Sequence, residues 1–132
     1  MARRPATPPP LADLETEVME RLWALGEASV REIMDACNAD RDKPRAYTTY
    51  LTIMSRLDEK AMVKRRRRGK GDIYRPAWER EAYMAARVTA EVDALVDQYG
   101  DVALTHFARQ VGQLDPARRR ALQRLARAEP GE

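Results

Sequence analysis

Apolar residues near the N-terminus recur every three or four positions, which is the spacing of one face of a helix. They are Leu11, Leu14, Val18, Leu22 and Leu25. Acidic side chains gather at the start of this segment, where the helix dipole favours negative charge. Gly26 follows the last apolar residue, as is typical just past the end of a helix. The pattern predicts a helix over residues 11–25.

A capping box predicts a second, short helix. Ser29 is followed three residues later by Glu32, and at this spacing each side chain accepts a hydrogen bond from the other residue's backbone N–H. Apolar residues then continue at helical spacing as far as Cys37. On such a face Cys37 is expected to be a core residue and not a reactive thiol.

A third helix is predicted over residues 46–60, after a polar loop that contains Pro44. One of its faces is apolar and consists of Tyr50, Ile53, Met54, Leu57 and Ala61. The opposite face consists of Thr48, Thr49, Thr52, Ser55, Arg56 and Lys60, with Leu51 as its one apolar residue. Threonine is a poor helix former, so this face favours hydroxyls that bind phosphates and base edges. Plain polar surface is the alternative.

A β-hairpin is predicted over residues 63–76. Val63 begins a basic run, the chain reverses through Arg68-Gly69-Lys70-Gly71, and it returns to Pro76. Three short helices, of which the last two resemble a helix-turn-helix, followed by such a hairpin make a winged helix-turn-helix. The hairpin is the expected wing.

Positive charge is concentrated in the same region. The chain has a net charge of +3, but residues 41–75 carry twelve basic and four acidic side chains, a net charge of +8. Taken alone, a basic run is more often solvated surface or a disordered tail. On a wing it favours contacts with phosphates beside the groove that the third helix occupies. The wing residues expected to bind DNA are Arg65, Arg66, Arg67, Arg68 and Lys70.

The sequence after Pro76 predicts three further amphipathic helices, the last of them with Asp115 as N-cap and Pro116 at its first position. Such short helices do not form a self-sufficient core, so their apolar faces need another surface. A second copy of the chain is favoured, because two DNA half-sites need two binding domains. Packing against the winged domain of the same chain is the alternative. The residues expected to mediate dimerisation are Met84, Val88, Val92, Leu95, Tyr99, Leu104, Phe107, Val111, Leu122 and Leu125.

The expected fold is mainly α with a small β-hairpin. A disordered Pro-rich tail over residues 1–10 precedes a winged helix-turn-helix DNA-binding domain over residues 11–77. A helical dimerisation domain over residues 78–128 and a disordered tail over residues 129–132 complete the chain.

Several other protein classes are not favoured. No apolar run approaches the ~20 residues of a membrane-spanning helix, and the basic N-terminus lacks the apolar stretch of a secretory signal. A cytoplasmic, nucleoid-associated location is therefore expected. Cys37 is the single cysteine and His106 the single histidine, which argues against a multi-ligand metal centre. No catalytic set or complete phosphate-binding loop is present, so the sequence predicts neither an enzyme nor a bound cofactor or metal.

Several short motifs follow one another in a characteristic order. They are Leu11-x-x-Leu14-Glu15, Val18-Met19-x-x-Leu22-Trp23, Ser29-Val30-Arg31-Glu32-Ile33, Tyr47-Thr48-Thr49, Thr52, Arg56-Leu57 with Lys60, and Tyr74-x-Pro76. Together they resemble the penicillinase-repressor (BlaI/MecI) family over residues 11–128. The resemblance implies a homodimeric repressor that binds palindromic operators, with Thr48, Thr49, Thr52 and Arg56 among the contacts of the third helix. Many relatives begin this helix with Ser-Pro-Lys-Thr, where this chain has Ala46-Tyr47-Thr48-Thr49.

The resemblance also bears on how repression is relieved. In β-lactam-responsive members a membrane sensor-protease system leads to cleavage of an Asn-Phe bond, and the local counterpart here is His106-Phe107. Copper-responsive members end in Cys-x-Cys motifs, which this chain lacks. A winged helix that binds RNA or another protein, without operator specificity, is the alternative to a repressor.

Overall fold

A computed structural model describes residues 7–128, so the predicted tail at 129–132 and the first six residues of the chain lie outside the described residues. The chain divides into two compact units, Met1–Arg87 and Val88–Glu132. None of the helices in the described part combines the length and hydropathy that a membrane crossing requires.

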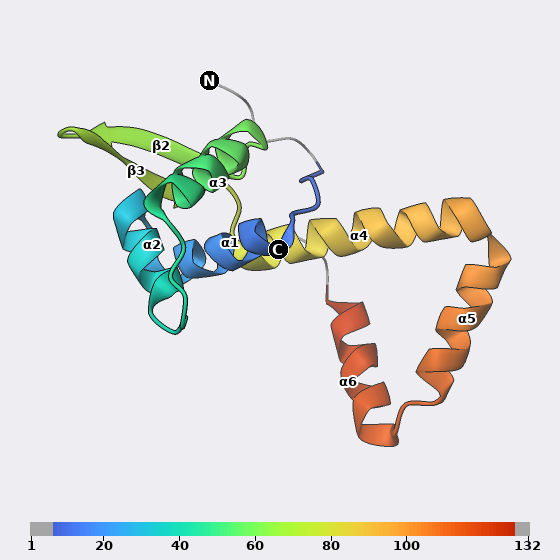
Figure 1. The fold of residues 1–132 in the computed structure, drawn as a ribbon. Helices are drawn as coiled ribbons and strands as arrows, with labels where there is room; N and C mark the ends of the chain where they lie inside the picture. The colour runs from blue at the N-terminus through green and yellow to red at the C-terminus, as the bar shows by residue number, and fades with distance from the viewer. Residues whose placement is uncertain (1–6, 129–132) are drawn as a thin grey trace. The chain divides into compact units, whose positions relative to one another are not determined.

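Three helices make up most of the first unit (Figure 1): α1 (Asp13–Leu25), α2 (Val30–Asn38) and α3 (Tyr47–Glu59). Helix α1 ends at Gly26, whose φ of 85° few other residues adopt without strain. The predicted capping box begins α2: the Glu32 N–H donates to the Ser29 hydroxyl at 3.2 Å, and the Ser29 N–H donates to the Glu32 carboxylate at 3.0 Å. All three predicted helices are confirmed within two residues at their ends.

A small antiparallel sheet completes the winged helix. Its strands are β1 (Ala28–Ser29), β2 (Val63–Arg68) and β3 (Gly71–Pro76), in the order β1-β3-β2. The predicted hairpin is confirmed, and Gly69 in its turn has a φ of 62°. Strand β1 was not predicted; it pairs Ala28 with Tyr74 and Ser29 with Ile73. Because of this pairing, the wing is joined to the segment between α1 and α2.

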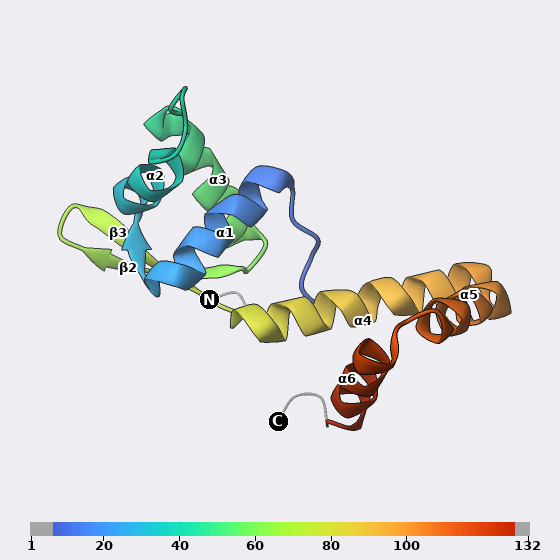
Figure 2. The ribbon, with the colours of Figure 1, turned by 90° about the horizontal axis from the view of Figure 1, so that it is seen from below.

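The core lies between α1, α2, α3 and the sheet, which Figure 2 shows grouped together. Side chains of all three helices are fully buried in it, among them Leu22, Ile33 and Tyr50. Val63 and Tyr74 contribute from the hairpin. Cys37 is buried at 3% exposure, so the prediction of a core cysteine is confirmed.

The start of α4 (Arg80–Tyr99) belongs to the first unit. The Trp23 indole N–H donates to the Trp78 carbonyl at 2.8 Å, and the rings of Trp23 and Tyr83 lie 5.6 Å apart. Arg80 binds Glu20 of α1 at 2.9 Å. The domain boundary expected between residues 77 and 78 therefore precedes the start of α4, which still packs on this core.

The structure differs from the expected N-terminal tail at residues 7–10. Pro8 is fully buried, and its carbonyl accepts a hydrogen bond from Arg87 at 3.0 Å. The Tyr83 hydroxyl donates to the Pro9 carbonyl at 3.3 Å. Proline loses little conformational entropy on ordering, and its carbonyl can still accept a hydrogen bond. These two properties allow the segment to pack on the fold.

The second unit contains the rest of α4 together with α5 (Asp101–Gly112) and α6 (Pro116–Arg127). The three helices predicted after Pro76 are confirmed. Gly100 separates α4 from α5 with a φ of 59°. The Asp115 carboxylate caps α6 by accepting a hydrogen bond from the Arg118 N–H at 2.8 Å, and Pro116 occupies the first helical position, as expected.

Candidate nucleic-acid interface

Helix α3 presents a polar surface opposite its buried face. Tyr50, Ile53, Met54 and Leu57 point into the core and are at most 5% exposed. Thr48, Thr52, Ser55 and Arg56 are exposed, and Thr49 is half-buried at the edge of this surface. The structure therefore brings together on one side of α3 the residues expected to contact DNA from it.

The hydroxyl of Thr52 already makes a hydrogen bond within the helix. Thr52 Oγ1 lies 3.1 Å from the Thr48 carbonyl one turn earlier and donates its proton there. Its oxygen can then only accept a hydrogen bond from outside the helix. The Thr52 hydroxyl is thus suited to an amino group on a base edge and not to a phosphate oxygen.

Lys60 does not belong to this surface, contrary to the expected polar face. Its ammonium binds Glu15 of α1 at 2.7 Å. Glu15 is only 2% exposed and also accepts the Ala12 N–H at 2.8 Å. Burial opposes ionisation of Glu15, but the hydrogen bonds from Lys60 and Ala12 outweigh it and lower the pKa of this carboxyl. The pair holds the end of α3 against α1, and Arg56 is left as the exposed cation on this surface.

A hydrogen-bonded clamp fixes the loop that leads into α3. The Asn38 side chain donates to the Arg45 carbonyl at 3.0 Å and accepts the Arg45 N–H at 3.1 Å. The Tyr50 hydroxyl donates to the same Asn38 oxygen at 2.8 Å. Arg45 in turn binds Glu17 of α1 at 2.7 Å. The N-terminus of α3 is therefore tied to both α1 and α2.

Strand alternation distributes the five consecutive cations of β2 over both faces of the wing. The register places Arg65 opposite Tyr74 and Arg67 opposite Asp72. Asp72 lies 3.9 Å from both arginines, and Asp58 at the end of α3 lies 3.8 Å from Arg65. One hydrogen bond to Tyr74 and these carboxylates raise the pKa of Arg65. On this face the positive charge is partly neutralised by the protein itself.

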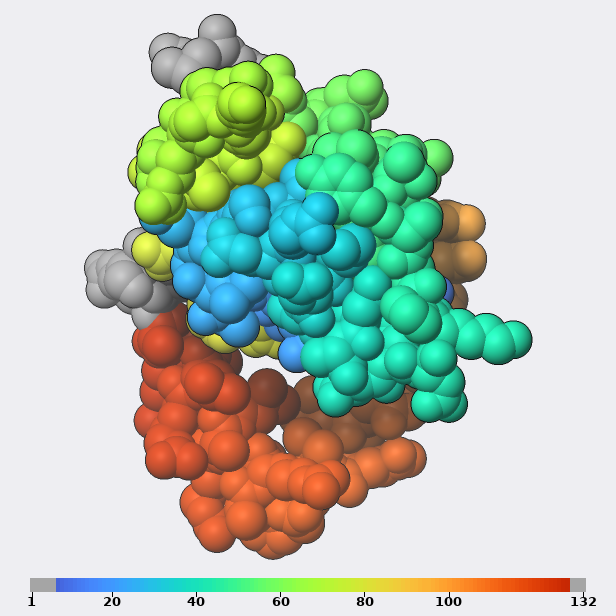
Figure 3. Space-filling view, turned by 60° about the vertical axis from the view of Figure 1, so that its left-hand side comes forward, coloured from blue at the N-terminus to red at the C-terminus, as the bar shows by residue number. Residues whose placement is uncertain are grey.

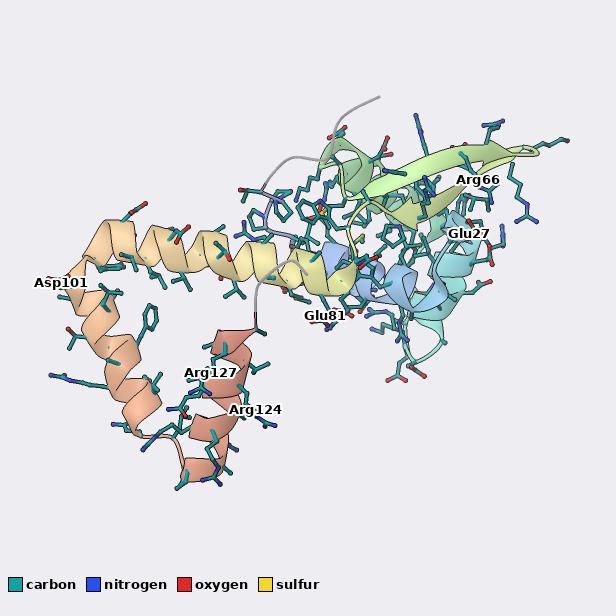
Figure 4. All side chains as sticks on the ribbon, turned by 180° about the vertical axis from the view of Figure 1, so that it is seen from behind. Glu27, Arg66, Glu81, Asp101, Arg124 and Arg127 are labelled. Carbon is teal, nitrogen blue, oxygen red and sulfur yellow. The ribbon has the colours of Figure 1, made fainter. Side chains whose placement is uncertain are left out.

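The other face of the wing carries Lys64, Arg66 and Arg68. Figure 4 labels Arg66 and Glu27, which form an ion pair of 3.2 Å between the wing and the segment before β1. Within the described chain, Arg68 and Lys70 at the tip of the wing form no ion pair. Figure 3 shows the wing, α2 and the loop before α3 side by side on one face of the first unit. The tip of the wing therefore carries two cations that no carboxylate of the described chain pairs with.

The residues expected to mediate dimerisation fall into two groups. Met84 is partly buried against the core of the first unit, which differs from the expectation of a free stripe. The others are exposed; Val88 is 59% and Leu125 is 72% exposed. His106 and Phe107, the candidate cleavage segment, lie in the middle of α5 and are both exposed. Among the described residues no group of histidine, cysteine and carboxylate side chains could hold a metal ion.

Three helices, a paired wing and a polar, cation-flanked helix surface define a winged-helix DNA-binding protein. The sequence model of the penicillinase repressor family matches residues 11–128. The chain therefore belongs to the penicillinase repressor family, and it is a DNA-binding transcriptional repressor and not an enzyme.

Named relatives agree with this assignment. The chain is similar to the transcriptional regulator BlaI of Mycobacterium tuberculosis in two strains, at 37% identity over 121 residues, which are 87% of this chain and 84% of the relative. Its fold is similar to the solution structure of the DNA-binding domain of the repressor BlaI. That match has a TM-score of 0.50 and 22% identity, and it covers 63% of this chain and 94% of that chain.

Proposed function

We propose that this protein is a homodimeric repressor that binds an inverted-repeat operator, with α3 in the major groove and the wing on the phosphate backbone. The observation that carries the proposal is the exposed row of hydroxyls on α3, with Arg56 beside it and the cationic wing on the same unit. The major groove is about 12 Å wide and admits one helix. Hydroxyl and guanidinium groups on that helix match base edges and phosphates.

The clamp around Asn38 supports α3 as the DNA-contacting element. Base contacts depend on placing several side chains within hydrogen-bonding distance at once, so a fixed helix binds with less loss of entropy than a mobile one. Asn38–Arg45 fixes the beginning of α3 and Glu15–Lys60 fixes its end. Both ends are therefore held before DNA arrives.

Self-association is supported by the exposed apolar side chains of the second unit. Within residues 88–128 no residue is buried, although Val88, Val92, Leu95 and Tyr99 form a stripe along α4. A contiguous exposed apolar stripe marks an interaction surface. A second copy of the chain would supply the second DNA-binding domain that an inverted repeat requires.

Derepression by cleavage is a further part of the proposal. A protease needs an extended backbone, whereas His106–Phe107 is helical. Cleavage there by a membrane sensor-protease system would require local unfolding of α5. Such a repressor would act in the cytoplasm, on chromosomal DNA.

The dimer is tested by sedimentation equilibrium and by DNA binding of one variant and its control. Leu95→Glu places a charge in the middle of the α4 stripe, at a residue that is 41% exposed. It should weaken self-association by about 2 kcal/mol or more. Gln98→Glu adds the same charge at an exposed position of the same helix and should leave the dimer intact.

Binding to a duplex with both half-sites should fall with Leu95→Glu, and binding to a single half-site should not. An unchanged molecular mass for Leu95→Glu would contradict the proposed dimer surface. Equal binding of an inverted repeat and of random DNA by the wild-type chain would contradict operator recognition and favour the alternative of a module without operator specificity.

A further inference from the structure

Helix α3 exposes two large apolar side chains next to its hydroxyls. Tyr47 and Leu51 are each 40% exposed. Within residues 7–87 of the structure the large apolar side chains exposed to this degree are Leu25, Tyr47 and Leu51. Two of the three therefore lie on the helix that is proposed to enter the major groove.

Their positions place them in one patch. Residues three and four apart are neighbours on a helix surface, so Leu51 adjoins Tyr47, Thr48 and Ser55. Helical side chains lean toward the N-terminus, which directs Leu51 over the turn that contains Tyr47 and Thr48. The Arg31 guanidinium of α2 lies 5.6 Å from the centre of the Tyr47 ring, on its face. The patch is thus a small apolar area inside a polar and cationic surface.

This setting indicates what covers the patch. Arg31 lies on the Tyr47 ring, Arg56 follows on α3, and the first acidic residue of α3 is Asp58, which is held near Arg65 at 3.8 Å. Such surroundings repel a cationic partner and favour a polyanion that itself carries small apolar groups. In the major groove of DNA that group is the C5-methyl of thymine, which is the one apolar substituent on a base edge there.

We propose that Leu51, with Tyr47 beside it, contacts a thymine methyl group and so determines part of the operator sequence. This inference rests on the proposed function, because it assumes that α3 lies in the major groove. Leu51 then has a function that the neighbouring hydroxyls cannot perform. A hydroxyl does not detect the methyl group that distinguishes thymine from uracil. Leu51 is then a specificity-determining residue.

The expected size of the effect follows from the area of one methyl group. Removing one buried methyl weakens binding by about fourfold, the factor that corresponds to ~0.8 kcal/mol per buried carbon group. In a dimer that contacts two symmetric half-sites, removing the equivalent methyl from both should weaken binding by roughly fifteenfold.

The test uses the full chain and DNA that the protein itself selects. A duplex library with a random central segment is enriched on the wild-type protein, and the selected duplex is synthesised with each thymine replaced in turn by 2′-deoxyuridine. Dissociation constants are measured by fluorescence anisotropy for the wild type, for Leu51→Ala and for Leu25→Ala. Leu25 is a matched control, because it is a leucine of α1 that is 49% exposed. Alanine preserves helix propensity in both variants.

We expect one thymine at which deoxyuridine weakens wild-type and Leu25→Ala binding by about fourfold per half-site, and at which it has no effect on Leu51→Ala. Three outcomes would overturn the inference: a selected sequence without A·T pairs, deoxyuridine substitutions that leave wild-type binding unchanged, or an equal loss in Leu51→Ala. In each case selective binding of the library shows that the chain still recognises a DNA sequence, so this part of the proposed function holds. Failure to enrich any sequence would instead contradict the proposed function.

Discussion

Replacing Arg68 and Lys70 together with alanine removes the cations at the tip of the wing, which form no ion pair within the described chain. Each phosphate contact releases counterions and contributes about −0.9 to the slope of log K against log salt concentration. If both cations bind phosphates, the slope of the double variant is shallower by about 1.8. Between about 50 and 200 mM salt, the advantage of the wild type over this variant should then shrink roughly twelvefold.

A second double variant shows whether position on the wing matters. Arg65 and Arg67 share Asp72 at 3.9 Å, so the three side chains together carry a net charge of +1. Because Asp72 competes with phosphate for both arginines, they are expected to make at most one phosphate contact, and Arg65→Ala with Arg67→Ala should reduce the slope by about 0.9 or less. Exposed pairs of this kind contribute only ~0–1 kcal/mol to folding, so both double variants should stay folded by circular dichroism.

The assay is fluorescence anisotropy with one labelled operator duplex at five salt concentrations. Arg120→Ala with Arg124→Ala removes the same amount of charge from α6 instead of the wing and serves as the control (Arg124 is labelled in Figure 4). We expect its slope to equal that of the wild type. Equal slopes for all three double variants would refute the reasoning, since net charge alone would then account for the salt dependence.

Two further substitutions and one labelling experiment test the packing that supports the site. Asn38→Ala removes the side chain that holds the Arg45 backbone and should lower the free energy of unfolding in urea by about 2 kcal/mol; an unchanged midpoint would contradict the clamp. Because the folded-state pKa of Glu15 is lowered, its stabilising contribution is present above the ordinary value of 4.5 and is lost as the pH falls below it. Glu15→Gln should be less stable than the wild type at pH 7, and its free energy of unfolding in urea should fall less steeply on acidification. If the free energies of the two proteins fell in parallel with pH, Glu15 would not contribute to the pH dependence of stability. Burial raises the pKa of the Cys37 thiol, so Ellman's reagent at pH 8 should label the native chain at least ~10-fold more slowly than the urea-unfolded chain; equal rates would mean that the thiol is accessible.

The sequence was sufficient for elements whose determinants are local. The capping box at Ser29 and Glu32 involves two side chains three residues apart, and the buried face of α3 follows from helical spacing alone. The wing was predictable because a glycine-containing turn joins two segments of strand-forming residues. In each case the physical cause lies within a few residues of its effect.

Other features depend on contacts between distant residues. Strand β1 has two residues, Ala28 and Ser29, neither of which favours a strand, and it exists because β3 offers a free edge. Lys60 has the spacing of the exposed face, yet a carboxylate 45 residues earlier removes it from that face. The neutralisation of Arg65 by Asp58 and Asp72 likewise requires the fold to bring α3 and the wing together.

The central claim, that this protein is a repressor directed to particular operators, is tested most directly by what it retains from genomic DNA. Sheared DNA of the source organism is passed over the full chain at near-physiological salt, and the retained fragments are sequenced. The account predicts a few intergenic fragments that share an inverted repeat, with half-site centres about 10 base pairs or a multiple of that apart. Retention of fragments without a shared motif would contradict it, because the wing would then bind phosphates without any base contacts from α3.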